Sequence, residues 1–568
     1  MATLESPGLN IYGSGDVSPL IPRQESLWQL FLRCNPDLVK EDKVILEESA
    51  NPSAKLTYGD ARRKAAEGAA GLKKRLGLKA GDVIALWGSN TLSWVLAAYA
   101  GTWSGITISA INPLASAHEM VHYLHSSDAV VLFGDSSLVS RFHEAQRLDT
   151  TEKLSKIEFV SLDQEATGQS PSTLVWPRDF LGNGTEPVLD LSKADNTKFP
   201  AAICFSSGTS GKPKGVVLSH HNLLAHMLGT RCSGPEAFSR KEVEVFYAPL
   251  CHIYGMVTAV LSPAFIGHLV VIMRVFDFQN YIHVCQKKRA TIMRVVPPTA
   301  MAMAKDKGLR ALDLSSVHTL SCAGAALGEA TQDSLQKLFN GVAVVQGYGM
   351  TEGGISALKP AYAREKSGSV GTLLPLVQMR LVDDNLKDVP PGESGEVYVS
   401  GPTNFMEYKN NPEATREAYP LGDGWLRTGD IARVDKDGFL WITDRKKELI
   451  KYKGHQVPPA ELEDVLLQFP DVAEAAVCAT WDESQETEIP VGYVNFKSEI
   501  DPHDRERKLK ELRAFADSRV ATYKKLRGGV HYLDVIPKSP TGKILRRQLP
   551  ARLEMEKRAI AAKRKIKL

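Results

Sequence analysis

The stretch from Ser206 to Gly215, SSGTSGKPKG, has the composition of a loop that binds phosphate. Glycines leave backbone N–H groups open to an anion, and the hydroxyls and lysines add donors and positive charge. The strand-like run PAAICFSS precedes the loop, and VVLSHHNLLAHML, with Ser219 as N-cap, has the pattern of a helix. The sequence therefore predicts strand, loop and helix in that order. The glycines are three residues apart, unlike those of the common pattern GxxxxGK[ST], and a flexible surface turn is the alternative for this loop considered alone.

The size and charge of the chain narrow the classes of function. A length of 568 residues predicts about two to four domains, and 43% hydrophobic with 24% charged residues is typical of a soluble globular protein. The net charge of +3 argues against a general nucleic-acid-binding surface. The seven cysteines form no C-x-x-C pair, so the sequence predicts neither a zinc site nor a disulfide framework, and a reducing compartment fits best.

Three segments of the chain could in principle direct it to a compartment or cross a membrane. The start, MATLESPGLN, lacks the basic residues and apolar core of a secretory signal. Residues Met256–Met273 carry no Asp, Glu, Lys or Arg, but Pro263 and Gly267 interrupt them, so we predict helix, turn and buried strand instead of a membrane span. The basic end KRAIAAKRKIKL is interpreted as a solvated helix end. Its last residues, Ile566–Lys567–Leu568, partly match the peroxisomal signal S-K-L, which makes a peroxisomal import receptor a candidate partner and the cytoplasm the alternative location.

The elements that must position the loop alternate between strand and helix patterns. GDVIALWG, ITISAINP and AVVLFGD read as strands, whereas NTLSWVLAAYAGTWSG and SAHEMVHYLHSS read as helices with a glycine stop and a serine cap respectively. This rhythm predicts an α/β class with largely parallel sheet and crossover helices. Later, PAELEDVLLQF reads as a helix and AEAAVCAT as a strand. We place a domain boundary near Arg445 to Lys447, which gives domains of residues 1–446 and 447–568.

Five further blocks give the loop SSGTSGKPKG its context. They are APLCHIYG, QGYGMTE, WLRTGD, DRKKELIKYKGHQVPPAELE and PKSPTGK. In this order and spacing the chain resembles the adenylate-forming superfamily of acyl-CoA synthetases, luciferases and adenylation domains, and most of all its 4-coumarate–CoA ligase and aryl or medium-chain acyl-CoA ligase branch. The resemblance implies a large N-terminal α/β domain of several subdomains, which binds AMP, and a small mobile C-terminal α/β lid.

The resemblance also implies a reaction in two steps. A carboxylate would attack the α-phosphate of ATP with Mg²⁺ present, giving an acyl adenylate and pyrophosphate, and the thiol of coenzyme A would then displace AMP. Charge that develops on phosphate oxygens explains why donors and cations must already be in place. Transfer of the acyl group to a carrier-protein thiol and luciferase-like oxygenation are the alternatives within enzymes. A non-catalytic nucleotide-binding relative would be expected to lack Lys543, Asp430 or Glu352, and all three are present.

The family motifs assign nucleotide contacts to residues in four blocks. The phosphate loop would hold the β- and γ-phosphates, Thr351 and Glu352 would contact the α-phosphate and Mg²⁺, and Asp430 would accept hydrogen bonds from the ribose. Gln346, Gly347 and Tyr348 would line the adenine and acyl sides, and Arg445 would also contact the ribose. The predicted ATP and AMP contacts are Ser206, Ser207, Gly208, Thr209, Ser210, Gly211, Lys214, Gln346, Gly347, Tyr348, Thr351, Asp430 and Arg445.

The acid would lie beside His252 of CHIYG, which matches the family histidine next to the carboxylate. A packed core histidine is the alternative for a lone histidine in an apolar stretch. The acyl pocket is predicted to include Tyr254, Thr258, Gly324, Ala325, Gly349 and Ile355, with a register uncertainty of one residue around Gly324. No acidic residue stands in CHIYGM where amino-acid-activating relatives place an aspartate, so the sequence favours an aryl or medium-chain acid.

The C-terminal blocks carry a second set of residues. Lys543 of SPTGK matches the lysine that bridges carboxylate and phosphate during adenylation, and Lys451 and Gln456 match residues that act on the thioester side. Lys453 and Gly454 match a coenzyme A contact, and Arg274 is the nearest cation to another position where plant ligases contact coenzyme A. Lys447 occupies the hinge position. Rotation about Lys447 would exchange the two lysine sets, so that one site serves both steps in turn.

Overall fold

The computed structural model describes residues 2–6, 9–13, 21–163, 173–206, 213–234, 239–325, 327–422, 424–453, 455–485, 487–497, 500–538 and 542–555. Ser207, Gly208, Thr209, Ser210 and Gly211 of the phosphate loop, Gly454, and Ile566–Leu568 lie outside the described residues, as does the side chain of Gln456. The expectation of a peroxisomal signal therefore stays a prediction. In the described part of the chain, no helix is long and apolar enough to cross a membrane.

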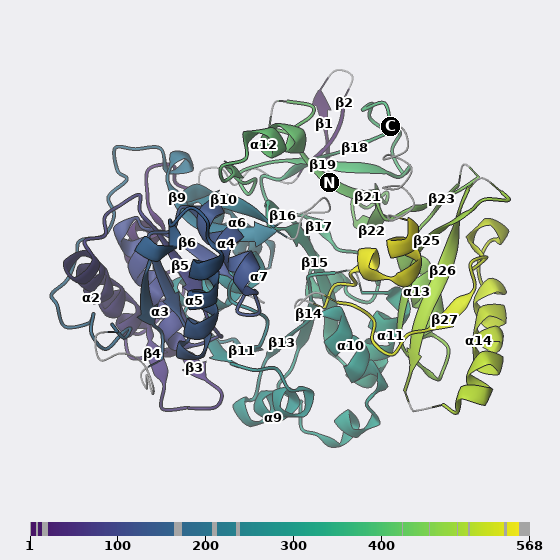
Figure 1. The fold of residues 1–568 in the computed structure, drawn as a ribbon, viewed down its shortest axis with the longest axis horizontal. Helices are drawn as coiled ribbons and strands as arrows, with labels where there is room; N and C mark the ends of the chain where they lie inside the picture. Colours follow the sequence, from purple (N-terminus) through teal and green to yellow (C-terminus); the bar gives the residue numbers. More distant parts are fainter. Residues whose placement is uncertain are drawn as a thin grey trace.

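The first large sheet consists mainly of parallel strands that form in the predicted alternation with helices (Figure 1). Buried β5, β6 and β7 pair in parallel, and β9 continues the sheet beside β6. The strand order is β20(Glu407–Tyr408), β10(Lys214–Ser219), β9(Pro200–Ser206), β6(Thr107–Ile111), β5(Val83–Trp87), β7(Val131–Gly134) and β8(Glu158–Ser161). The helices of this part are α2(Tyr58–Leu76), α3(Leu92–Ser104), α4(Ala117–Ser127) and α5(Val139–Leu148).

The helix ends follow the predicted capping chemistry. Ser116 accepts a hydrogen bond from the backbone N–H of Glu119 and so begins α4, and Gly105 ends α3 in the left-handed conformation that glycine adopts without strain. Around the phosphate loop the prediction is corrected. The loop is followed by strand β10, which pairs antiparallel with β9, and helix α6(His220–Ser233) begins only after it, at the predicted cap Ser219.

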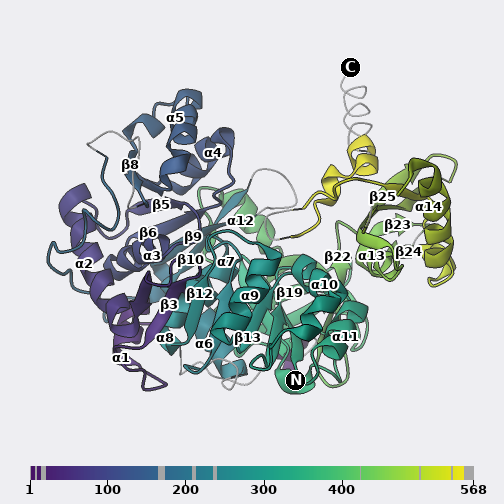
Figure 2. The ribbon, with the colours of Figure 1, turned by 90° about the horizontal axis from the view of Figure 1, so that it is seen from below.

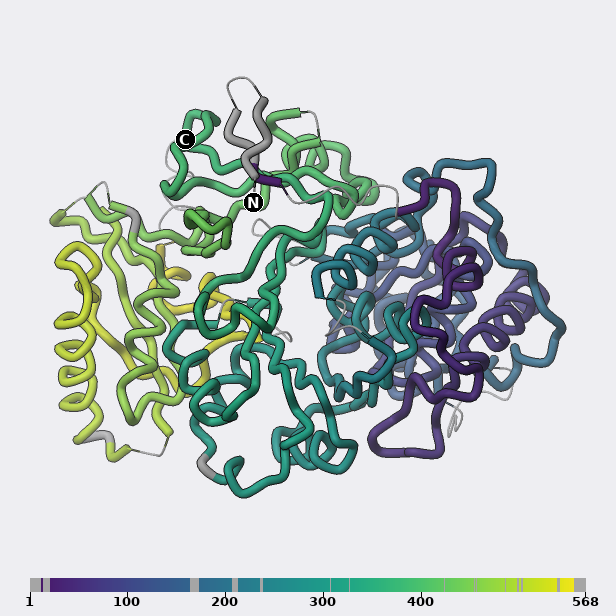
Figure 3. The backbone as a smooth tube through the Cα atoms, turned by 180° about the vertical axis from the view of Figure 1, so that it is seen from behind, coloured from purple at the N-terminus to yellow at the C-terminus, as the bar shows by residue number. Residues whose placement is uncertain are grey.

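The second large sheet is built mainly from residues 243–373, the teal to green part of the chain in Figure 3, together with two strands from near the N-terminus. Its central strands β11 to β15 are parallel, so their carboxyl ends share one edge. The order is β17(Thr372–Leu373), β16(Gly353–Ala357), β15(Ala343–Met350), β14(Thr319–Cys322), β13(Ile292–Val295), β11(Val243–Phe246), β12(Leu269–Ile272), β3(Val44–Glu48) and β4(Lys55–Thr57). Helices α1(Leu27–Arg33), α6, α9(Phe278–Lys288), α10(Pro297–Lys305) and α11(Glu329–Leu338) belong to this part.

Residues Met256–Met273 form the predicted helix, turn and strand. A short helix α7(Ile253–Gly255) continues as a π-helix, Met256–Leu261, and then as α8(Ser262–Ile266). Gly267, with φ of +78°, ends α8, and the buried strand β12 follows. The apolar run is therefore core of a folded protein.

A third sheet and a smaller C-terminal part complete the molecule. The third sheet has the order β1(Ala2–Ser6), β2(Leu9–Gly13), β18(Gln378–Val382), β19(Gly395–Ser400), β21(Leu426–Val434) and β22(Leu440–Arg445), with α12(Pro412–Ala418) nearby. Beyond β22, a small lobe has its own hydrophobic core, and a segment of it reaches back to the larger part (Figure 2, yellow). The lobe contains β23(Ile450–Tyr452), β24(His455–Val457), α13(Pro459–Leu467), β25(Val472–Asp482), β26(Thr487–Phe496), α14(Pro502–Asp517) and β27(Val530–Tyr532).

Candidate active site

A cavity of about 1180 Å³ lies where the two parts of the molecule meet. It brings together residues from all six sequence blocks, although these blocks are spread over more than half of the chain. The predicted residues that line it are Ser206, Lys214, His252, Tyr254, Thr258, Gly324, Gln346, Gly347, Tyr348, Gly349, Thr351, Glu352, Arg445, Lys447 and Lys543.

The block QGYGMTE lines the cavity because it lies at the carboxyl end of the parallel strand β15. This is the edge at which α/β sheets bind ligands. Gln346 is buried, and its side-chain amide is committed to structure: it accepts from the N–H of Leu327 at 2.9 Å and donates to Gln332 Oε1 at 3.0 Å. Gln346 therefore fixes the turn after β14, and the exposed backbone of Gly347 and Gly349 leaves room for a ligand.

At one end of the cavity, a tyrosine, a carboxylate and a guanidinium contact one another. Tyr348 Oη donates to Asp430 Oδ2 at 2.6 Å, and Arg445 Nε lies 3.3 Å from Asp430 Oδ1. Asp430 and Arg445 are partners in the β21–β22 ladder, which fixes their spacing. Burial, reinforced by the charge of Asp430, raises the pKa of Tyr348 well above its usual value, so Tyr348 stays a donor. Asp430 lies just behind Thr428 and Gly429, which line the cavity.

Glu352 also lines the cavity, in the turn after β15. It is buried, and its Oε1 accepts a hydrogen bond of 2.7 Å from Tyr408 Oη. Lys214 Nζ lies 4.6 Å from the centre of the Tyr408 ring, within the range of a cation–π contact. Burial and the charge of Glu352 raise the pKa of Tyr408, which keeps this hydroxyl protonated. A carboxylate and a lysine at a cavity wall next to the phosphate loop suit a triphosphate with its cation.

His252 lies at the start of α7, next to the irregular π-helical turn. Its Nε2 is buried without a hydrogen-bond partner among the described residues, and burial lowers the pKa of the ring, so His252 is neutral near pH 7. Single π-helical turns are common at functional sites, because the extra residue re-aims the side chains around it. Here the π-helical segment places Thr258 on the cavity wall. Tyr254, in the preceding helix α7, also lines the cavity.

The far wall of the cavity contains a buried ion pair that the sequence did not indicate. Arg294 on β13 donates to both oxygens of Glu244 on β11, at 2.5 and 2.7 Å. His268 is also buried there, with Nε2 4.0 Å from Glu244 Oε1. Burial lowers the pKa of His268 to about 4, so it is neutral. Because Glu244 balances Arg294, this wall carries polar groups without a net charge.

Lys543 enters the cavity from the C-terminal part. The neighbouring Gly542 has φ of +80°, and a Cβ at this position would lie 2.7 Å from Pro298 Cγ in α10 of the larger part. Burial first, and then the positive charge of Arg445, lower the pKa of Lys543 to about 8. The structure therefore holds a titratable cation close to the Asp430–Arg445 pair.

The structure leaves other predicted residues outside the cavity lining. Ile355 is fully buried in the hydrophobic core, and the residues that line the cavity beside it are Gly354 and Ser356. Ala325 does not line the cavity, whereas Ala323 does, in keeping with a register one residue earlier. Lys451 and Lys453 are exposed on the C-terminal lobe. Arg274 lies 3.5 Å from both Asp135 and Asp163, so its charge is already balanced.

Comparison with known families agrees with this arrangement. Residues 38–409 match the family described as AMP-binding enzyme, and residues 461–543 match the AMP-binding enzyme C-terminal domain. The chain belongs to the AMP-binding enzyme family. A probable 4-coumarate–CoA ligase 2 of Dictyostelium discoideum is 34% identical over 488 residues, which is 85% of this chain and 87% of that protein. A 4-coumarate–CoA ligase 1 of Oryza sativa subsp. japonica is 33% identical over 519 residues, 88% of each chain.

Several solved structures share the fold of this chain. An anthranilate CoA ligase in complex with anthranoyl-AMP superposes with a TM-score of 0.81 at 24% identity, covering 96% of this chain and 99% of that one. A benzoate CoA ligase from Burkholderia xenovorans has a TM-score of 0.78 at 23% identity, covering 92% and 99%. These likenesses confirm the predicted fold class of a large N-terminal α/β domain and a smaller C-terminal one.

Four side chains at or behind the cavity wall of this AMP-binding enzyme were not predicted from the sequence. They are Tyr408, Glu244, Arg294 and His268. None belongs to a motif with a spacing of its own, and the partners are 50 or more residues apart for Arg294 and Tyr408. The one available signal was the charged Glu244 inside the strand-like VEVF, since a charge in a buried strand needs a partner.

Proposed function

We propose that this AMP-forming acid–CoA ligase acts on a carboxylate whose aryl or medium-chain alkyl group is uncharged, and that it uses Mg²⁺ with ATP. A carboxylate oxygen attacks the α-phosphorus, the bond to the bridging oxygen breaks, and pyrophosphate leaves with that electron pair. The coenzyme A thiol then attacks the acyl carbonyl, AMP leaves, and the thiol proton goes to solvent. Two observations support this proposal. The chain has relatives named 4-coumarate–CoA ligases, and the cavity wall around the expected acyl site has small residues and no net charge.

The single observation that carries the proposal is the entry of Lys543 into the cavity that also contains His252, Tyr348 and Glu352. A cation at this point can hold the attacking carboxylate against the α-phosphate and stabilise the charge that develops there. Electrostatic stabilisation of this kind is commonly the largest contribution to catalysis. Because Lys543 belongs to the smaller lobe, the described pose is the one suited to adenylation.

The residues at the Glu352 end fit a magnesium ion held jointly with ATP. In the described part of the chain no three His, Cys, Asp or Glu side chains cluster as a metal site of their own. Mg²⁺ typically binds through one or two carboxylates together with substrate phosphates, and Glu352 supplies one buried carboxylate. Mg²⁺ would neutralise phosphate charge as pyrophosphate leaves. Lys214 adds positive charge to the same wall, and Tyr408 fixes the orientation of Glu352.

The nature of the acid follows from the part of the cavity around His252 and Arg294. His252 is neutral, so it can hydrogen-bond the carboxylate or define the wall beside it without adding charge. Arg294 is already paired with Glu244, so an acid with a free amine would meet no unpaired carboxylate among the described residues of that wall. Small residues at Gly324 and Gly349 leave space for a ring or an alkyl chain.

The test is pyrophosphate release with a panel of aryl, arylacetic, cinnamic and C4–C12 fatty acids, together with amino acids. We expect release with several aryl or fatty acids, since one methylene in an apolar pocket changes specificity by only about 1–3 kcal/mol. AMP formation should then depend on coenzyme A. Faster release with amino acids than with every aryl or fatty acid would contradict the proposed substrate, and acyl transfer to a carrier protein in preference to coenzyme A would favour the carrier alternative.

A further inference from the structure

We propose that helix α4 positions the triphosphate end of the active site, with His122 and Asp128 as the positioning residues. The proposal rests on the proposed function, because it concerns the same ATP site. The phosphate wall is defined here as β10, β20 and Glu352. Neither His122 nor Asp128 belongs to the sequence blocks of the family resemblance, and neither lines the cavity.

The first contact joins α4 to the two flanks of the phosphate loop. His122 Nε2 donates to the backbone carbonyl oxygen of Pro213 at 2.6 Å, just after the loop. The next residue, Tyr123, packs its ring edge-on against Phe205, with centroids 4.4 Å apart, just before the loop. The flanks are also paired with each other, because Ser206 and Lys214 are partners in the β9–β10 ladder. Two consecutive residues of α4, His122 and Tyr123, thus contact the segments directly after and directly before the phosphate loop.

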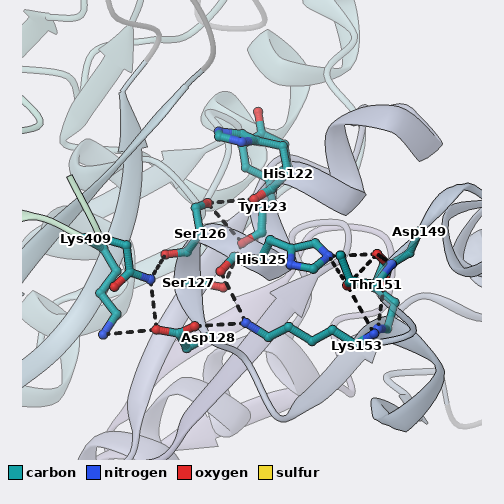
Figure 4. Close-up of polar contacts among 12 residues, drawn as sticks. His122, Tyr123, His125, Ser126, Ser127, Asp128, Asp149, Thr151, Lys153 and Lys409 are labelled. Atoms are coloured by element: carbon teal, nitrogen blue, oxygen red, sulfur yellow. Dashed lines mark hydrogen bonds and ion pairs between the residues drawn. The ribbon is translucent and has the colours of Figure 1, made fainter.

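The second contact joins the end of α4 to β20. Asp128 caps α4 in the left-handed conformation, with φ of +58°, and its carboxylate gathers three donors (Figure 4). The donors are Lys153 at 2.9 Å, Asn410 at 2.9 Å and Lys409 at 3.4 Å. Asn410 also donates to the carbonyl of Ser126 at 3.3 Å. The carboxyl end of α4 is therefore fastened to the residues directly after Tyr408.

These contacts continue to Glu352. The N–H of Lys409 donates to the carbonyl of Gly215 on β10 at 2.7 Å, and β20 pairs with β10 through Tyr408 and Val216. Tyr408 Oη in turn donates to Glu352. A displacement of Asp128 would therefore be transmitted through the short strand β20 to Glu352, the carboxylate that would share the magnesium ion.

The contacts of α4 involve only the triphosphate side of the site. The groups suited to AMP, namely Tyr348, Asp430 and Arg445, lie on β15, β21 and β22, and their mutual contacts do not pass through α4. Loss of the α4 contacts should therefore weaken ATP more than AMP. A general loss of structure would weaken both equally.

The experiment measures the Kd of Mg·ATP and of AMP for the full chain by titration calorimetry. His122→Phe keeps a ring and removes the donor, and Asp128→Asn keeps a residue that tolerates the left-handed conformation while removing the charge. We expect each to weaken ATP about three- to tenfold and AMP less than twofold, in line with the loss of one hydrogen bond. His122→Gln retains an N–H donor and should restore most of the ATP affinity.

The matched control is His125→Phe, the same change one turn along α4. The His125 ring points away from His122 and contacts Asp149 at 3.0 Å (Figure 4). It should leave the ratio of ATP to AMP affinity unchanged. Equal weakening of ATP and AMP, no weakening of either in the His122 and Asp128 variants, or the same ratio change in His125→Phe would overturn the proposal. The binding titration contains no carboxylic acid and so does not depend on which acid is the substrate. If the wild-type chain binds ATP but releases no pyrophosphate with any acid of the panel, only the proposed substrate is contradicted. If it binds neither ATP nor AMP, both the proposed function and this inference are contradicted.

Discussion

Lys543 brings a positive charge into a half-buried position beside another cation. Burial and Arg445 both disfavour its protonated form, and the negative charges of Glu448 and Asp430 compensate only in part, so its pKa falls to about 8. Adenylation needs the charged form, because the charge is what holds carboxylate and phosphate together. The lysine is therefore close to half protonated at slightly alkaline pH, where a surface lysine would be fully charged.

The first prediction concerns the pH dependence of adenylation. A lysine whose pKa is lowered keeps its charge below that pKa and loses it above. We therefore expect kcat/KM for pyrophosphate release, which reports the free enzyme, to fall above about pH 8 and to approach a tenfold loss per pH unit. Lys543→Arg stays charged throughout, so its lower activity should show no such fall. Initial rates between pH 6 and 10 decide this, and parallel falls in both proteins would exclude Lys543 as the titrating group.

At the residue scale, the site residues that lie in short sequence motifs could be predicted from the sequence. Lys543, Glu352 and Tyr348 stand in short blocks, and all three line the cavity. The Arg294–Glu244 pair could not be predicted, because two strands far apart in sequence bring it together. Tyr408 was missed for the same reason: a tyrosine in a short strand is an ordinary residue until Glu352 is seen to accept its hydrogen bond.

At the element scale, the segments that capping and periodicity assigned to helix or strand form as predicted, and the main error lay next to the phosphate loop. The sequence suggested that the loop leads directly into a helix, but GVVLS forms β10 instead. β-branched residues favour strand, and β10 gains two partners, β9 and β20. The partner β20 lies almost 200 residues later, so the sequence around the loop contains no trace of it.

The turn that carries Lys543 allows a prediction at this scale. Gly542→Ala should strain the left-handed backbone and press the new methyl group against Pro298. Left-handed strain costs roughly 1–2 kcal/mol, which corresponds to a 5- to 30-fold smaller population of the docked turn. We expect the rate of acyl-adenylate formation to fall by about that factor. The conversion of a presynthesised acyl adenylate to the thioester should change little.

Gly529→Ala is the control for this prediction. Gly529 has nearly the same left-handed φ, +86°, in the same lobe, but a Cβ there would meet only its neighbour His531, at 3.3 Å. Its substitution should lower the stability of the lobe without separating the two half-reactions. Equal slowing of both half-reactions by Gly542→Ala would show that this glycine matters for folding rather than for placing Lys543.

At the scale of the whole molecule, described residues of the two parts contact one another at several polar groups. Lys305 of α10 donates to the carbonyls of Val472 and Ala473 in the lobe, at 3.1 and 2.8 Å. Asp464 of α13 lies against Gly328, so closely that a Cβ at Gly328 would overlap its carboxylate. Burial, with the charges of Glu329 and Glu463, raises the pKa of Asp464 to about 6. The ionised Asp464 therefore works against this pose.

This carboxylate makes the balance between poses depend on pH. A carboxyl whose pKa is raised on docking favours docking when protonated, so the adenylation pose is strongest at low pH and weakens as pH rises toward and through about 6. The ratio of thioester rate to adenylate rate should therefore increase between pH 5 and 7, by at most about tenfold per unit. Asp464→Asn should flatten this increase and lower the ratio at pH 7. Glu461→Gln, on the same helix but paired with Lys524 inside the lobe, should behave as wild type.

The alternation of the two lysine sets is the last prediction, and it depends on the segment around Lys447. Lys446 is fixed to the larger part by ion pairs with Glu396 at 2.9 Å and Asp384 at 2.7 Å, so rotation of the lobe must occur beyond it. In the described pose Lys543 lines the cavity, whereas Lys451 is exposed on the lobe. The two lysines therefore cannot act in the same pose, and each half-reaction should depend on one of them.

Two substitutions separate the half-reactions. Lys543→Ala should slow adenylate formation by about 10²–10³, the usual effect of losing one electrostatic donor, and largely spare thioester formation from a presynthesised acyl adenylate. Lys447→Pro should do the opposite, because proline fixes φ near −65° and removes a backbone donor, which hinders rotation. Lys447→Ala removes the same side chain without restraining the backbone, so it isolates the effect of rotation. If Lys543→Ala slows both steps equally, or Lys447→Pro resembles Lys447→Ala, the lobe does not alternate between two catalytic poses and a single pose must serve both steps.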